Sequence, residues 1–145
     1  MSLFSLLSVS ASGMAAQRER AELLVENMAN AETTRTPEGG PYRRKDVVFE
    51  SQPVTSPFAS VFESLTTPAL TGVRVRETIV DTREPEKRYL PGHPDADAQG
   101  YVAFPRANPA EDMVNLMGAV RNYGANVAAI TAVKDMIQRS LDLLR

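Results

Sequence analysis

The chain has 145 residues, with 16 basic and 18 acidic side chains and a formal net charge of −2 at pH 7. This length is that of one ordinary domain with a modest core, and the near balance of charge gives no electrostatic reason to expect nucleic acid or an anionic membrane as a partner. Cysteine is absent, which excludes disulfides, thiolate metal sites and cysteine nucleophiles. No apolar run approaches the roughly 20 residues of a membrane-spanning helix. The apolar N-terminus has no basic residue ahead of it, so we expect no cleaved secretory signal.

The N-terminal segment, residues 1–35, is predicted to be helical from residue 3 to about residue 30. Apolar or small side chains recur there at steps of three, four and seven residues, and no proline interrupts the pattern. The part between Ser8 and Ala16 has unusually small side chains, which favours the close approach of a second helix; a helix that is merely weak is the alternative. The residues expected to contact other helices are Leu3, Leu7, Met14, Leu24 and Met28.

Residues 36–108 are predicted to form a β-rich, loop-rich middle unit. All ten prolines fall between positions 31 and 110, which excludes a long helix through this region. The segments YRRKDVVFE and GVRVRETIVD alternate well enough to predict strands, with Val73, Val75 and Ile79 on one side. Residues from about 51 to 70 are rich in Ser, Thr and Pro, and we expect a flexible insert there.

Residues 109–145 have the clearest pattern in the chain, that of a long helix. Asn108 is a good N-cap, and Pro109 suits the first helical position. Apolar residues then follow heptad spacing over more than four heptads, which favours coiled-coil packing over an ordinary amphipathic helix on a globular core. Only Lys134 is charged in this column, which consists of Met113, Leu116, Val120, Tyr123, Val127, Ile130, Lys134, Ile137, Leu141 and Leu144.

These segments together predict a mainly α fold with a small β-rich middle. The long terminal helices should pair as an antiparallel coiled coil, with the irregular β unit projecting from it. A lone pair of helices leaves much of each apolar stripe uncovered, so other chains should cover it. This design suits a subunit of an assembly better than a free enzyme.

The stretch PDADAQGYV, residues 94–102, is the one motif that resembles a metal site. Asp95 and Asp97 match the first positions of a calcium-binding EF-hand loop, but the twelfth position is an arginine instead of the required glutamate. A looser transition-metal site formed by His93 and the two aspartates is a second possibility. We favour a turn in which both aspartates accept backbone N–H bonds and Gly100 eases the reversal, with no metal and no cofactor.

No catalytic constellation is evident in the sequence. No Ser or Cys motif identifies a nucleophile beside His93, and no glycine-rich phosphate loop occurs. The basic triplet of Arg43, Arg44 and Lys45 is interpreted as a solvated strand edge or, alternatively, as a contact to a partner. We therefore expect no enzymatic activity, no small-molecule substrate and no nucleic-acid partner; a metal-dependent enzyme is the rival hypothesis.

Three stretches resemble the bacterial flagellar axial proteins. SASGMAAQRER followed by VENMANAETTRTPEGGPYRRKDVVF is similar to their N-terminal signature, and the segment from Pro91 to Val102 is similar to one typical of a proximal rod member. MVNLMGAVRNYGANVAAITAVKDMIQRSLDLLR resembles the C-terminal helix of that member. The matches to the signature include Asn27, Met28, Ala29, Asn30 and Thr33, and the departures from the family patterns are Glu26, Glu32, Leu90 and Gly124.

The resemblance implies a structural subunit of the flagellar rod. Such proteins are exported unprocessed through the flagellar type III apparatus and polymerise into a rod that crosses the periplasm and transmits torque to the hook. The implied partners are other rod proteins, copies of the same chain, ring or adaptor proteins at the rod base, and the export apparatus. Another rod or hook subunit, or a coiled-coil component of a related type III secretion system, is the alternative.

The terminal helices are the expected assembly interface. Asn27 and Asn30 are expected to make hydrogen bonds at the end of the first helix, with tolerated polar surface as the alternative. The expected interface residues are Leu3, Leu7, Met14, Leu24, Asn27, Met28, Asn30, Met113, Leu116, Val120, Tyr123, Val127, Ile130, Ile137, Leu141 and Leu144.

Overall fold

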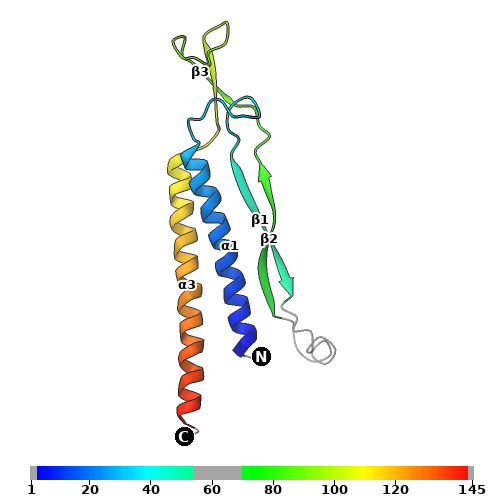
Figure 1. Ribbon diagram of the computed structural model, residues 1–145, viewed down its shortest axis with the longest axis vertical. Coiled ribbons are helices and arrows are strands. Elements are labelled where there is room, and N and C mark those ends of the chain that lie inside the picture. Colours follow the sequence, from blue (N-terminus) through cyan, green and yellow to red (C-terminus); the bar gives the residue numbers. More distant parts are fainter. Residues whose placement is uncertain (1–2, 54–69, 144–145) are drawn as a thin grey trace.

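The computed structural model describes residues 3–53 and 70–143 of the chain. Helix α1 (Leu3–Ala29) is followed by strands β1 (Lys45–Pro53), β2 (Thr71–Val80), β3 (Glu86–Tyr89) and β4 (Tyr101–Phe104), and then by helix α3 (Pro109–Asp142). The two helices lie side by side and run in opposite directions (Figure 1). The predicted mainly α fold with a small β-rich middle is therefore confirmed.

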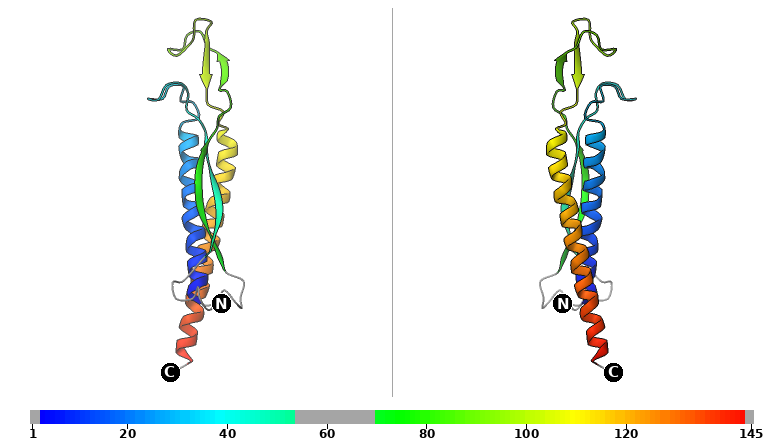
Figure 2. Two further views of the ribbon diagram at one scale, coloured as in Figure 1. Left: turned by 90° about the vertical axis from the view of Figure 1, so that its right-hand side faces the viewer. Right: turned by 90° about the vertical axis from the view of Figure 1, so that its left-hand side faces the viewer.

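Helix α1 is the central element of an elongated molecule. It contacts α3 on one side and the β1–β2 hairpin on the other (Figure 1). The second hairpin, β3–β4, projects beyond the end of the helix pair, whereas both chain termini lie toward the opposite end, as the two turned views also show (Figure 2). The molecule thus has one long helical side and two distinct ends.

The β1–β2 hairpin contains an irregularity that changes which side chains face α1. Its antiparallel register runs from Lys45 opposite Val80 to Pro53 opposite Thr71, with a shift between Val48 and Phe49. The extra residue on β2 is Arg76, and such a bulge moves the side chains beyond it to the other face.

This bulge and the length of β1 correct two expectations. Val73 and Val75 are half-buried, but Ile79 lies beyond the bulge and is exposed, so the prediction that all three share a face is wrong. Strand β1 continues to Pro53, so the first three residues of the expected insert at 51–70 are strand, and residues 54–69 lie outside the described part of the chain.

Helix α3 begins as its sequence predicts. The Asn108 side chain accepts hydrogen bonds from the backbone N–H groups of Ala110 and Glu111, and Pro109 occupies the first turn. The cap satisfies N–H groups that no helical carbonyl can reach. Neither helix in the described ranges is long and apolar enough to cross a membrane.

The buried core is small and has two parts. Ala16, Leu24, Ala119 and Val133 are buried apolar residues of the two helices. A second cluster lies where the helix pair meets the β unit. It contains Asn27, Tyr42 and Asp112, whereas two further buried residues, Val102 and Phe104, belong to β4. More large apolar side chains are exposed than buried among the described residues, which is unusual for a protein that acts as a free monomer.

Candidate assembly surface

Asn27 ties the end of α1 to the beginning of β1. It is fully buried, and its Nδ2 donates to the Lys45 carbonyl at 2.7 Å. Its Oδ1 accepts from the Lys45 N–H and from the Tyr42 hydroxyl, both at 2.9 Å. One side-chain amide therefore satisfies both backbone groups of a strand residue and a buried phenol, which requires a donor and an acceptor on the same group.

Tyr42 is a neutral donor in this cluster over the whole physiological range. Burial, together with the negative charge of Glu26, raises the pKa of Tyr42 to about 12. Because the phenol keeps its proton, it can donate continuously to Asn27. Tyr42 was not among the expected site residues, and its segment is predicted as a strand, whereas β1 begins only at Lys45 and Tyr42 lies in the loop before it.

Asn30 makes the helix-end hydrogen bonds that the sequence predicts. Its Nδ2 donates to the Glu26 carbonyl at 3.0 Å, and its Oδ1 accepts from the Thr33 hydroxyl at 3.1 Å. Asn27 has a different partner from the one expected, because it bonds to the returning strand instead of to the helix end. The reason is its position in the last turn of α1, where it faces β1.

Arg44 and Asp112 tie the beginning of α3 to the same segment. Nη2 and Nε of Arg44 donate to Oδ1 of Asp112 at 2.7 and 3.2 Å, and the Asp112 side chain is only 1 % exposed. The carboxylate raises the pKa of Arg44, so the guanidinium stays charged. No hydrogen-bond donor in the described residues reaches Oδ2 of Asp112. The pair is therefore the main compensation for burying this charge.

Each member of the basic triplet bonds within the chain, although Arg43 is also exposed, and a contact to a partner stays a prediction. Arg43 donates to the Asp81 backbone carbonyl at 3.2 Å, and Lys45 bonds to Glu26 at 2.7 Å. With Arg44 bound to Asp112, each member of the triplet has a partner on a different element or loop. The segment from Tyr42 to Lys45 consequently joins both helices to the β unit.

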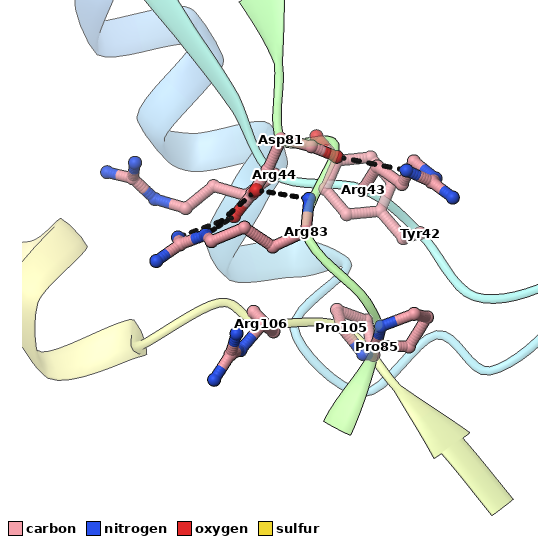
Figure 3. Close-up of a pocket in the computed structure, with 8 residues that line it drawn as sticks. All are labelled: Tyr42, Arg43, Arg44, Asp81, Arg83, Pro85, Pro105 and Arg106. Carbon is pink, nitrogen blue, oxygen red and sulfur yellow. Dashed lines mark hydrogen bonds and ion pairs between the residues drawn. The ribbon is translucent and has the colours of Figure 1, made fainter. Parts of the chain in front are cut away.

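A small cavity opens beside this segment and is too small for a substrate. Its volume is about 10 Å³, close to that of one water-sized probe. Figure 3 shows Arg83 folded back onto Asp81 at its rim, and these hydrogen bonds lower the pKa of Asp81 to about 2. The remaining lining residues are Tyr42, Arg43, Arg44, Pro85, Pro105 and Arg106.

The acidic turn between β3 and β4 is built mainly as the sequence predicts. Asp97 Oδ1 accepts from the N–H groups of Tyr101 and Gln99, both at 2.8 Å, and these bonds lower the pKa of Asp97. Gly100 has φ of +84°, a conformation that favours glycine. Asp95 differs from the expectation, because it accepts from the Thr34 hydroxyl at 2.8 Å. Among the described residues, no group of three or more His, Cys, Asp or Glu could hold a metal ion.

The helices approach each other closely where α1 has small side chains. A Cβ atom added to Gly13 would lie 3.0 Å from Oδ1 of Asn126, so the glycine makes room for the α3 side chain. This contact confirms the close approach expected from the run of small residues. Of the α1 residues expected to make contacts, Leu24 is buried, Leu3 is exposed, and Leu7, Met14 and Met28 are half-buried.

The heptad column of α3 divides into two sets in the structure. The residues that are buried on this helix are Asp112, Ala119 and Val133, each one position before a member of the expected column. Leu116, Ile130 and Ile137 are half-buried and fit both columns. The other apolar members in the described residues are 41–60 % exposed, namely Met113, Val120, Tyr123, Val127 and Leu141, and the charged member, Lys134, is exposed too. Leu144 lies outside the described residues, and the role of the column in assembly stays a prediction.

A lateral face of α3 is thus available to a partner. We use the name outer face for the exposed residues Met113, Met117, Val120, Tyr123 and Val127. They recur at steps of three and four residues, which keeps them on one side of the helix. Asn27 and Arg44, by contrast, hold the subunit together internally and do not belong to this face.

Comparison with known proteins gives matches over part and over all of the chain. A family model described as "Flagellar basal body rod FlgEFG protein C-terminal" matches residues 98–143. A "Flagellar basal-body rod protein FlgC" of Borreliella burgdorferi is 37 % identical, over 100 % of this chain and 99 % of the relative. Proteins of the same name from Salmonella typhimurium and Bacillus subtilis are 36 % and 38 % identical. Both matches extend over 99 % of this chain. They cover 98 % of the Salmonella typhimurium protein and 99 % of the Bacillus subtilis protein.

Proposed function

This chain belongs to the flagellar basal-body rod protein FlgC family, and on that premise we propose that it assembles into the rod laterally, through the outer face of α3. The chain is a structural subunit of the basal-body rod and assembles with other rod components. In the proposal it is exported through the flagellar type III apparatus with its N-terminus intact and functions in the periplasm without catalysis. Its partners there are copies of itself, other rod proteins and the ring or adaptor proteins at the rod base.

The observation that carries this proposal is the apolar outer face itself. Met113, Val120 and Val127 follow one another at seven-residue steps, with Met117 and Tyr123 between them, and all five are exposed. A 3.5-residue period suits knobs-into-holes packing against a further helix. Full burial of one such side chain contributes about 1.5–3 kcal/mol, so lateral contact along this face would stabilise a polymer substantially.

The ties at Asn27 and Asp112 support a role in transmitting torque. Both bind residues of the short segment from Tyr42 to Lys45, one from the end of α1 and the other from the beginning of α3. A rotation applied to the helix pair is therefore passed to the β unit through hydrogen bonds and a buried ion pair. A subunit of a drive shaft needs this stiffness.

Complementation of a strain that lacks the gene tests the proposal. The double variant Val120→Asp with Val127→Asp places two charges in the outer face, and burial of an unpaired charge is strongly unfavourable. We expect normal protein levels but loss of rods in electron micrographs of basal bodies, and loss of swimming. Ala132→Asp is the control, because this exposed residue lies about 120° around the helix from Val120. Normal rods in the double variant would refute the lateral contact.

A further inference from the structure

The β3–β4 hairpin is joined to the rest of the molecule by two short connections. Residues 81–85 lead from β2 into β3, and residues 105–108 lead from β4 into α3. No other described helix or strand packs against either strand of this hairpin. The hairpin stands beyond the end of the helix pair in Figure 1 and in both views of Figure 2. Its orientation therefore depends on the two connections and on contacts made by loops.

Two prolines separate this hairpin from the first one. The ladder of β1 and β2 extends to Asp81, whose N–H donates to the backbone carbonyl just before β1 at 2.8 Å. The ladder of β3 and β4 begins with Glu86 opposite Phe104. Continuing this register would place Pro85 opposite Pro105, and neither residue has an N–H group to donate. Both prolines line the same small cavity at this point (Figure 3). The second ladder therefore stops at the prolines and does not continue toward β1 and β2.

Asp95 makes the polar contacts that cross from this hairpin to the rest of the chain. Its Oδ2 accepts a hydrogen bond from the Thr34 hydroxyl at 2.8 Å. The Arg35 guanidinium lies 3.9 Å from its Oδ1, but the Arg35 side chain is 82 % exposed, so this ion pair contributes little. Among the residues that the structure describes, no other member of the segment 86–104 has a hydrogen bond or ion pair to a residue outside it. We use the name clasp for the hydrogen bond between Thr34 and Asp95.

Each side of the clasp is ordered by bonds of its own. On the loop that follows α1, the Thr33 carbonyl accepts from the Tyr42 N–H at 2.9 Å, which ties Thr34 to the buried junction. On the hairpin, the Asp95 N–H donates to Nδ1 of His93 at 3.1 Å. The clasp thus joins two structured loops. Breaking it changes how the two parts are placed relative to each other more than it changes the shape of either part.

We propose that the β3–β4 hairpin turns as a unit about its two connections and that the clasp holds it in the observed orientation. The connections meet at the prolines and define an axis, and the clasp is a third attachment away from that axis. Three attachments fix an orientation, whereas two leave a rotation free. Val102 of β4 is fully buried in the observed orientation, so apolar contact stabilises it as well. This inference concerns the chain by itself and does not depend on the rod function.

Pulsed electron paramagnetic resonance on the full-length chain measures the orientation of the hairpin. Because the chain has no cysteine, spin labels can be attached at Gln99→Cys in the hairpin and Thr78→Cys in β2, both at exposed positions. With the clasp intact, we expect one narrow distribution of distances between the labels. Thr34→Val keeps the shape of the side chain but removes the hydroxyl. The ratio of turned to aligned hairpins should then rise roughly tenfold or more, because the lost bond has a charged acceptor. Thr34→Ser keeps a hydroxyl and should give the narrow distribution again.

Thr36→Val is the matched control, because the Thr36 hydroxyl bonds only to backbone carbonyls of its own loop. Hydrogen exchange at the Leu90 amide, which donates to the Gly100 carbonyl at 2.9 Å, separates turning from unfolding, since a hairpin that turns as a unit keeps this bond. Three results would overturn the inference. They are a broad distribution with the clasp intact, equal distributions in Thr34→Val and Thr36→Val, and a loss of Leu90 protection that accompanies the broadening.

Discussion

Replacement of Asn27 by alanine tests the tie between α1 and β1. The change removes three hydrogen bonds, from Nδ2 to the Lys45 carbonyl and from the Lys45 N–H and the Tyr42 hydroxyl to Oδ1. At about 1 kcal/mol for each bond, the cost is about 3 kcal/mol. The partners that remain are poorly placed to find water, because Asn27 is fully buried and Tyr42 is nearly so. We therefore expect the junction to open far more often in the variant.

Hydrogen exchange at the Lys45 amide measures this opening directly. A loss of about 3 kcal/mol corresponds to exchange that is roughly 100-fold faster, at 1.36 kcal/mol for each factor of ten. Asn122→Ala is the matched control, because this side chain is exposed, and its expected cost is below about 0.5 kcal/mol. If the Lys45 amide exchanges at the same rate in both variants, the assignment of Asn27 as a structural tie is wrong.

Two further predictions concern charged groups of the same junction. Arg44→Ala leaves the buried Asp112 carboxylate unpaired and should cost about 3–5 kcal/mol in urea unfolding. Arg74→Ala removes an exposed pair with Glu50 and should cost less than about 1 kcal/mol, and equal losses would contradict the difference in burial. The pKa of Asp81, held at about 2 by Arg83, lies below the unfolded value of about 4. Its stabilising effect is therefore present above pH 4 and lost as the pH falls toward 2. Asp81→Asn should make the melting temperature depend less steeply on pH between pH 4 and 2 than it does in the exposed control Asp135→Asn. An equal dependence on pH in the two variants would argue against this role.

Features that depend on neighbours within a few residues follow from the sequence. The cap of α3 requires only Asn108 and Pro109 at the beginning of an apolar pattern, and the structure has this cap. The turn before β4 requires Asp97 and a glycine three residues later, and these residues make it. Long helices at both ends with a proline-rich middle follow in the same way, because proline and the apolar period act locally.

Features that depend on distant residues do not follow from the sequence. Arg44 and Asp112 are far apart in the chain, and no local pattern pairs them. Asp95 finds Thr34 across a similar separation instead of a backbone amide of its own turn. The bulge at Arg76, which turns Ile79 outward, arises from the register with β1 and not from the alternation within β2.

The sequence by itself determines that α3 is a long helix with an apolar 3.5-residue period, since that period is written in the order of its residues. It does not determine which of two adjacent columns faces α1, because both share Leu116, Ile130 and Ile137. The tertiary structure decides in favour of the column with Asp112, Ala119 and Val133. The physical reasons are that small residues such as Gly13 and Ala119 let the helices approach, and that Arg44 supplies the charge that Asp112 needs when buried. The neighbouring column, with its larger apolar side chains, consequently stays on the surface.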